Sequence, residues 1–233
     1  MNTIDDVVAG LQRLDRELPA PDGVACFARL YLKMTEEVGG AVQSAAFADP
    51  GFMTRLDVVF ATRFFDALDR HARGTEDVPH AWQALFEARE RAGVSVLQFA
   101  LAGMNAHINF DLALALVDTC EEAGIALEDG SPQHTDYVRI NEVLAATSDK
   151  VKGWLVTGKL AVADAALGRA DDVAALWSIF RARDAAWTQA EVLWSVRSVP
   201  RLRRRYVDSL DRFVGFAGRG MLLPAPDLQT LRR

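Results

Sequence analysis

The sequence predicts an all-α fold, in which about eight helices pack as one globular bundle around a central apolar helix at residues 94–123. The chain has 233 residues, of which 50% are hydrophobic, and this is enough to bury a large core. No stretch alternates β-branched and polar residues over a useful length, so strands are not indicated. Apolar residues recur instead at helical spacing, in segments separated by Gly and Pro. We expect a single domain over residues 1–233.

Two helices are expected in the N-terminal part. The first spans about 3–18, with Thr3 as its N-cap, and the prolines that follow end it. Asp22 can cap the second helix, at about 23–47, which the pair Gly39-Gly40 could divide.

The next two helices have clear starting signals. Asp49-Pro50 combines an N-cap with a proline in the first turn, and this helix runs to about Arg73, before Gly74. Val78-Pro79 opens a shorter helix at 80–91, and Gly93 separates it from the central helix.

The C-terminal half begins with a loop, because Gly, Asp, Ser and Pro follow one another closely between Gly124 and Pro132. Thr135 or Asp136 is expected to start the next helix. The remaining helices are expected at about 135–157, 159–167, 170–196 and from Pro200 onward, with an extended tail after Gly220.

Net charge and cysteine content argue against several classes of function. The net charge of −6 disfavours nucleic acid as the main partner. One basic cluster is either a solvated helix face or a patch for an anionic partner; it consists of Arg197, Arg201, Arg203, Arg204 and Arg205. Cys26 and Cys120 stand alone, which indicates neither a disulfide framework nor a zinc site. With no secretory signal evident and no charge-free apolar span, we expect a cytoplasmic protein without a membrane partner.

Four polar residues lie in the middle of the central helix. At about 100° per residue, His107 and Asp111 share one face, and Asn105 and Asn109 lie on roughly the opposite one. A buried polar group costs about 1–3 kcal/mol when it has no partner, so each must find one. His107 and Asp111 therefore form a catalytic acid/base pair, supply two metal ligands, or make a structural bridge that fixes helix register. The small residues Ala100 and Gly103 leave space, or allow close backbone approach, beside His107.

Residues of other helices could complete a site with this pair. Asp57 lies among apolar neighbours, which would raise its pKa unless it pairs with Arg55 or Arg63. Tyr31 and Thr35 are one helical turn apart, and their hydroxyls could equally be satisfied by backbone.

The helices after the loop add further candidates. Asn141 is a better functional candidate than Asp136, which we interpret as a helix cap. Asp184 and Trp187 place a carboxylate and an indole donor on one face, where core packing with an arginine pair is the alternative. The substrate-binding candidates are thus Tyr31, Asp57, Asn105, Asn109, Asn141, Asp184 and Trp187.

Several motifs of known chemistries are absent. The chain has no His-Glu-x-x-His helix and no Glu-x-x-His pair, so standard zinc and di-iron sites are not indicated. It also lacks a Gly-rich phosphate loop after a strand and a Gly-x-Ser-x-Gly elbow. We expect no cofactor and no bound metal.

Three segments resemble one protein family. The central motif Gly103-Met-Asn-Ala-His107-Ile-Asn109-Phe-Asp111-Leu112 is similar to the signature of an uncharacterised bacterial family, domain of unknown function 5995. Two looser segments agree with it, Phe27…Tyr31…Thr35 and Arg55…Asp57…Phe60-Ala61. The resemblance spans most of the chain and implies a helical, single-domain protein of actinobacterial type. It implies no reaction.

The leading hypothesis is an enzyme, of lyase or isomerase type in secondary metabolism, with an apolar pocket inside the bundle. His107 would act as general acid/base, oriented by Asp111, in the isomerisation, elimination or cyclisation of a small hydrophobic or polycyclic metabolite. One alternative is a non-catalytic ligand-binding or interaction protein whose polar core is structural. Another is a metal-dependent hydrolase that uses the same pair. A homodimer is compatible with each of these three functions.

Overall fold

In the N-terminal half, polar side chains cap the first turns of the helices and so determine where the helices begin. The computed structural model describes residues 1–43, 47–157 and 169–224, with side chains described outside 43 and 145–178. In α1 (Ile4–Glu17), Thr3 and Asp6 form a capping box. α2 (Gly23–Gln43) begins after Asp22, whose Oδ1 accepts the backbone N–H of Val24 at 2.8 Å. α3 (Pro50–Ala72) begins after Asp49, which accepts the N–H of Phe52 at 2.9 Å.

The central helix forms one rod of three consecutive parts. These are α5 (Val96–Ala106), a π-helical segment η1 (His107–Asp111) and α6 (Leu112–Ala123). Gly124 ends the rod with φ +65°, a left-handed conformation that favours glycine. Before the rod lies α4 (His80–Ala88), and after it come α7 (Pro132–Thr157), α8 (Arg169–Ser195) and α9 (Pro200–Met221). Counting the rod as one, eight helices lie within the described residues, which confirms the all-α prediction.

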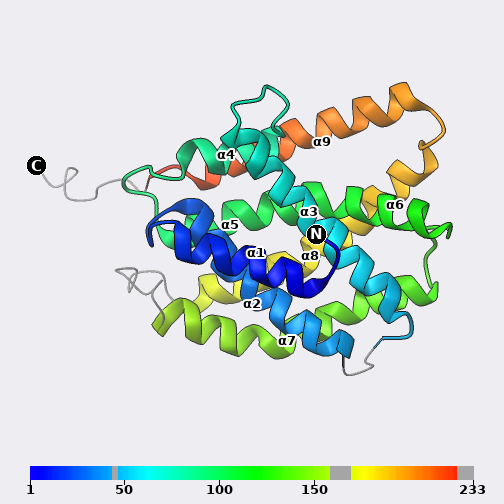
Figure 1. Cartoon of the computed structure of the whole chain (residues 1–233), viewed down its shortest axis with the longest axis horizontal. Coiled ribbons are helices and arrows are strands. Elements are labelled where there is room, and N and C mark those ends of the chain that lie inside the picture. Colours follow the sequence, from blue (N-terminus) through cyan, green and yellow to red (C-terminus); the bar gives the residue numbers. More distant parts are fainter. Residues whose placement is uncertain (44–46, 158–168, 225–233) are drawn as a thin grey trace, which may run out of the picture.

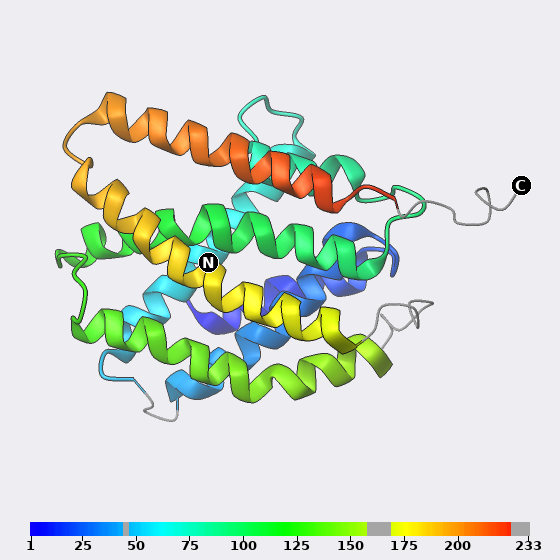
Figure 2. The same cartoon turned by 180° about the vertical axis from the view of Figure 1, so that it is seen from behind.

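Other helices surround the rod. In Figure 1, α1, α2 and α3 lie on its near side, and α9 runs above it beside α4. Figure 2, from behind, shows α8 crossing the far side of the rod, with α7 below. α3 and α8 both contact η1 and α6, whereas α2 and α9 contact α5. The rod's middle is therefore enclosed by helices far apart in sequence.

The rod is apolar and long enough to cross a membrane by length and composition, but 89% of its most apolar window is buried inside the bundle. A core helix passes the same test of length and composition. Here the neighbouring helices cover the apolar surface.

Two expectations about helix boundaries differ from the structure, and a third cannot be compared with it. α2 passes through Gly39 and Gly40 without a break, because Gly inside a helix lowers its stability by only about 1 kcal/mol. α7 begins at Pro132, three residues before the expected start, because proline fits the first helical turn. The expected helix at 159–167 lies outside the described residues.

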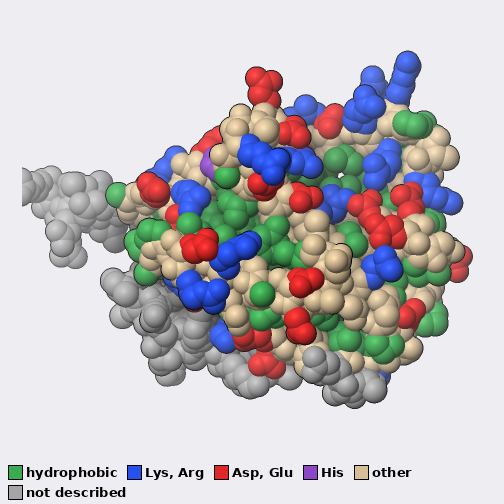
Figure 3. Space-filling view, viewed as in Figure 1, with side chains coloured by type: hydrophobic (Ala, Val, Ile, Leu, Met, Phe, Trp, Pro, Cys, Tyr) green, Lys and Arg blue, Asp and Glu red, His purple; other side chains and the backbone are tan. Residues whose placement is uncertain are grey.

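Arginines gather over the start of α9, at the upper right of Figure 3. Arg201, Arg204 and Arg205 are exposed there, and Arg203 pairs with Asp118 of α6 at 3.6 Å. The fifth arginine, Arg197, lies over the ring of Trp194 at 4.2 Å. The outer face of α9 also exposes apolar side chains, including Phe213 and Phe216.

Candidate functional site

The π-helical segment in the middle of the rod carries both predicted catalytic residues. It starts at His107 and ends at Asp111, and the N–H of Leu112 donates to the carbonyl of His107, five residues back. We predicted regular α-helical geometry throughout the central helix, and this prediction is wrong at this turn. Single π-turns in α-helices are frequent at functional sites, because they insert one residue into a turn and redirect the side chains around it.

His107 and Asp111 contact each other inside the protein. His107 Nδ1 lies 3.4 Å from Asp111 Oδ2, and the two side chains are 1% and 2% exposed. The same Oδ2 accepts a hydrogen bond from Nε1 of Trp82 in α4, at 2.9 Å. A carboxylate only accepts hydrogen bonds, so it favours the tautomer of His107 with the proton on Nδ1. This tautomer leaves the lone pair on Nε2.

Aromatic rings from two helices fix the imidazole plane. Phe60 of α3 stacks on His107 with ring centroids 3.5 Å apart and planes 7° from parallel. Tyr31 and Phe27 of α2 approach it edge-on, at 4.4 and 5.6 Å. Burial in this environment lowers the pKa of His107, against the opposing effect of Asp111, so the imidazole is neutral at pH 7.

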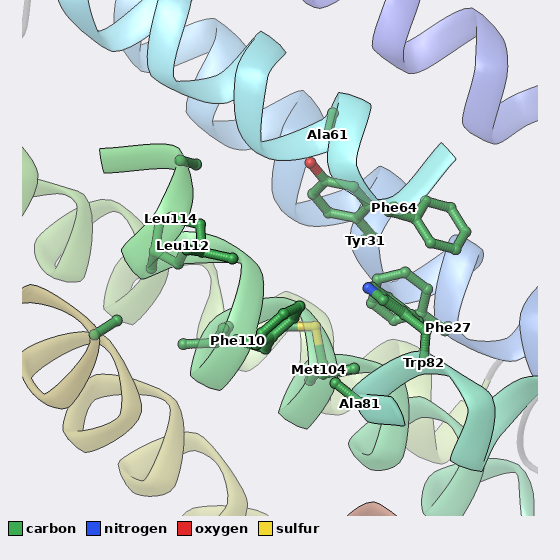
Figure 4. Packing of buried hydrophobic residues seen from close by; sticks show 14 of the residues in the cluster. Phe27, Tyr31, Ala61, Phe64, Ala81, Trp82, Met104, Phe110, Leu112 and Leu114 are labelled. Carbon is green, nitrogen blue, oxygen red and sulfur yellow. The ribbon is translucent and has the colours of Figure 1, made fainter. Parts of the chain in front are cut away.

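Gly103 allows α2 to approach the rod this closely. A Cβ at this position would lie 2.4 Å from the ring of Phe27, which is far inside van der Waals contact. Figure 4 shows Phe27 and Trp82 packed together near Tyr31 and Phe64, beside the segment that carries Met104, Phe110 and Leu112. Of the two expectations for Gly103, close backbone approach is the one that the structure shows.

A cavity of about 80 Å³ adjoins His107; we call it the His107 cavity. It lies between α2, α3, the rod, α7 and α8, and most of its lining is Met, Leu, Ile and Val. Four buried polar atoms on its lining residues have no hydrogen-bond partner in the described part of the chain: Tyr31 Oη, Thr35 Oγ1, Asp57 Oδ2 and His107 Nε2. Because an unsatisfied buried polar group is costly, these atoms favour a water or ligand in the cavity that completes their hydrogen bonds.

Asp57 pairs with neither arginine that we considered. Arg55 pairs with Glu122, and Arg63 pairs with Asp118, both on α6. Asp57 Oδ2 is instead shielded from solvent at the cavity, although part of the residue is exposed. Burial raises the pKa of Asp57 from 3.8 to about 7, so near neutral pH the carboxyl exists in both protonation states.

The hydroxyls of Tyr31 and Thr35 were predicted as possible backbone donors, but neither makes such a bond. Burial, with Asp57 as a secondary cause and against the opposing effect of the nearby Thr35 hydroxyl, raises the pKa of Tyr31 well above 10, so its hydroxyl stays protonated. It is a hydrogen-bond donor facing the same space as His107.

Asn105 and Asn109 lie on the other side of the rod, as the helical spacing predicted. Asn105 Nδ2 donates to the carbonyl of Val214 in α9 at 3.0 Å, and Asn109 Nδ2 donates to Asn105 Oδ1 at 3.0 Å. Both residues line a second cavity, of about 160 Å³, which we call the Asn109 cavity. They do not contact the His107 cavity.

Asn141 and Asp136 of α7 hold other parts of the chain in place. Asn141 Oδ1 accepts from Nε of Arg183 at 2.8 Å, and Arg183 lines the His107 cavity. Asp136 is buried inside α7 and accepts the N–H groups of Ala48 and Asp49, at 2.9 and 2.7 Å. It is therefore not the cap of its own helix, because α7 begins a turn earlier and Asp136 satisfies the start of α3 instead.

Asp184 and Trp187 do not form a site together. Asp184 is exposed on α8, whereas Trp187 is buried and donates to Asp129 Oδ1 at 2.7 Å in the loop before α7. Three residues along a helix differ by about 60°, which turns one side chain to solvent and the other to α7. Neither lines the His107 cavity.

Sequence reasoning missed three residues of this environment. Trp82 was not singled out as a site residue, and Phe60 appeared only in a segment that resembles the family. Arg183 was not singled out, although it is only 7% exposed. Its helical spacing from Ile179, Ala186 and Trp187 was the one available signal, because burial of an arginine is rare without a specific role.

The donor groups of the described residues do not gather as a metal site would require. Within 1–43, 47–157 and 169–224, no group of three or more His, Cys, Asp or Glu side chains could hold an ion together.

A family model supports the resemblance seen in the central motif. The model of a family of unknown function, DUF5995, matches residues 4–224. The chain belongs to this family. The match runs from α1 to the end of α9, so it includes every residue of the His107 cavity. No curated protein and no solved structure matches this DUF5995 chain.

Proposed function

We propose that this DUF5995 protein is an enzyme that transfers a proton to or from a small molecule held in the His107 cavity. The observation that carries the proposal is the set of four unpartnered polar atoms around one apolar cavity. Such a set is costly in a protein that binds nothing, and it is useful in one whose ligand completes the hydrogen bonds.

His107 is the base in this proposal. Asp111, held by Trp82, keeps the proton on Nδ1 and leaves the lone pair of Nε2 free toward a ligand. Because burial lowers the pKa of His107, the imidazole is in the form that accepts a proton at pH 7. The ring of Phe60 stacks on the imidazole and restricts its rotation away from the cavity.

Asp57 and Tyr31 supply the complementary acid groups. The pKa of Asp57, raised to about 7 by burial, lets this carboxyl give or take a proton near neutral pH. The Tyr31 hydroxyl, which stays protonated, can donate a hydrogen bond to an oxygen on which charge develops. Two titratable groups with opposite shifts around one cavity are typical of acid/base catalysis.

The cavity size restricts the substrate. A single water needs roughly 10–15 Å³, so about 80 Å³ holds a few waters or a ligand of several heavy atoms. A polycyclic metabolite would not fit this space as it stands. Isomerisation or elimination beside a carbonyl group suits it better than cyclisation of a long precursor.

Exchange of carbon-bound protons tests this proposal without knowledge of the natural substrate. Small carbonyl compounds (2-butanone, cyclopentanone and 2-oxobutanoate) are incubated with the protein in D₂O, and deuterium uptake is followed by NMR. We expect exchange above the buffer rate for at least one compound, and a loss of about 100-fold or more in His107→Ala, since general acid/base groups contribute about 10²–10⁴ in rate.

The matched control is His80→Ala, which removes an exposed imidazole outside the cavity. It should leave exchange unchanged. A folded His107→Ala protein that exchanges protons as fast as the wild type would refute the role of His107. Lack of exchange with every compound would contradict the proposal as a whole.

A further inference from the structure

The His107 cavity and the Asn109 cavity are separated only by a thin wall. Met104, Ile108 and Ile179 line both of them, two from the rod and one from α8. The Asn109 cavity, at about 160 Å³, is the larger and is mainly apolar. Apolar cavities of about 150 Å³ are known to take up a molecule the size of benzene.

Met104 is the movable part of this wall. A methionine side chain has three rotatable bonds and no branch, so it changes shape at low cost. Ile108 and Ile179 are branched at Cβ and are stiff by comparison. A change of rotamer at Met104 would open a passage between the two spaces without movement of the helices.

The wall formed by α8 also carries a buried cation. Arg183 donates from Nε to Asn141 Oδ1 at 2.8 Å and from Nη2 to the carbonyl of Tyr137 at 2.7 Å. Its guanidinium lies 4.3 Å from the centre of the Tyr137 ring. All of these partners are neutral, and no carboxylate of the described residues forms an ion pair with Arg183. The charge of Asp184, the exposed next residue, acts on Arg183 without forming an ion pair with it. A buried charge without a paired counter-ion is unfavourable, so this position favours an anion that comes from outside the chain.

Asp57 does not act as that counter-ion. It lines the same cavity, but none of the hydrogen bonds described for Arg183 goes to Asp57, and Asp57 Oδ2 has no partner among the described residues. Below pH 7 it is largely a neutral carboxylic acid, because burial raises its pKa to about 7. In that form it can donate a hydrogen bond to an anion rather than repel it.

We propose that the two cavities form one binding site for a small monocarboxylic acid with an apolar chain. The carboxylate would lie in the His107 cavity against Arg183, and the chain would pass Met104 into the Asn109 cavity. This assignment rests on the proposed function, since it names the class of molecule that occupies the same site.

Calorimetric titration of the intact chain with straight-chain acids, from butanoate to decanoate, tests the proposal at pH 6. Each methylene that enters an apolar space should raise affinity about fourfold, until the chain fills the second cavity and the gain stops. Primary alcohols of matched length should bind at least about tenfold more weakly, because they lack the charge. The proposal would be overturned if affinity did not change with chain length, or if alcohols bound as tightly as acids. It would also be overturned if none of the acids bound.

Two variants locate the ends of the ligand. Arg183→Gln should weaken binding of the acids at least about tenfold and leave the alcohols unchanged. Arg183 also joins α7 to α8, so Arg183→Gln could weaken binding by disturbing the fold. A second variant leaves these contacts intact. Ala182→Phe fills the Asn109 cavity and should abolish the gain from longer chains, whereas butanoate binds as before. Equal gains per methylene in Ala182→Phe and wild type would show that the chain lies elsewhere.

The pH dependence gives a third readout. As pH rises from 6 to 8, Asp57 ionises and its negative charge faces the ligand carboxylate, so the acids should bind several-fold more weakly. The other titratable or charged groups that line this cavity are Tyr31, His107 and Arg183. Tyr31 stays protonated, and burial favours the neutral form of His107 and lowers the pKa of Arg183. None of these groups gains negative charge below its own pKa or becomes more positive as pH rises, so none reverses the trend. Asp57→Asn should remove the dependence, and an unchanged dependence in that variant would contradict the placement.

Failure of this inference is distinguishable from failure of the proposed function. If the acids do not bind but 2-butanone still exchanges protons, only the substrate class is wrong. If the acids bind and no compound exchanges, the site binds acids without the proposed chemistry. His107→Ala should lose exchange and keep binding of the acids.

Discussion

The ionisation of Asp57 offers the sharpest thermodynamic test of the cavity. Its pKa of about 7 in the folded protein exceeds the ordinary value of 3.8, so the folded state binds a proton more tightly than the unfolded state. A group of this kind costs no stability below pH 4. The cost grows as pH rises from about 4 to 7, and it is constant above that range.

The change to make is Asp57→Asn, measured at pH 5 and pH 8 by urea denaturation. The cost in stability grows only from pH 5 up to the folded pKa of about 7, which is two pH units. At about 1.36 kcal/mol per unit, the change in the free energy of unfolding is therefore at most about 2.7 kcal/mol. Part of Asp57 is exposed, so solvent reduces this, and we expect about 1–2 kcal/mol. Relative to wild type, the variant should therefore gain this much stability at pH 8 compared with pH 5.

Asp184→Asn is the matched control, because Asp184 is exposed. Its effect on the free energy of unfolding should be the same at both pH values. If Asp57→Asn also shows the same difference from wild type at pH 5 and pH 8, the carboxyl is not buried as described and the reasoning about the cavity fails.

Three further substitutions test the surroundings of His107. Trp82→Phe removes the donor to Asp111 and should lower the free energy of unfolding by about 1.5–3 kcal/mol, as for hydrogen bonds to charged groups, measured by urea denaturation. Gly103→Ala should cost about 1–3 kcal/mol in the same assay, because the new methyl group overlaps the ring of Phe27. Tyr31→Phe removes a buried hydroxyl without a partner, so thermal unfolding of the free protein should occur at an equal or higher temperature.

Each of these has a control with the same chemical change elsewhere. Trp194→Phe alters a half-buried indole and should cost less than 1 kcal/mol. Gly40→Ala adds a methyl group in α2 with no atom within 4 Å, and should stabilise by about 0.5–1 kcal/mol. Tyr206→Phe changes a partly buried tyrosine of α9 and should have little effect. Costs as large in the controls as at the site would contradict the specific contacts described.

Local signals in the sequence were sufficient for most of the fold. The caps at Thr3, Asp22 and Asp49 act through neighbouring backbone N–H groups, so the residue types and their order reveal them. The contact between His107 and Asp111 also follows from spacing within one helix. These features depend on a few consecutive residues.

The rest of the site depends on contacts between distant segments, which no local pattern contains. The hydrogen bond from Trp82 to Asp111 joins residues 29 apart, and the stacking of Phe60 on His107 joins α3 to the rod. Asp136 looked like a cap because aspartate is common there, whereas its real partners precede it by 87 and 88 residues. The π-helical turn was missed because regular helical periodicity was assumed through the motif.

The state of His107 is the most direct test of the account as a whole. Nitrogen-15 NMR of the imidazole distinguishes protonated from unprotonated ring nitrogens. At pH 7 we predict a neutral ring with the proton on Nδ1 and the free lone pair on Nε2. A charged imidazolium at pH 7, or a neutral ring with its proton on Nε2, would contradict it.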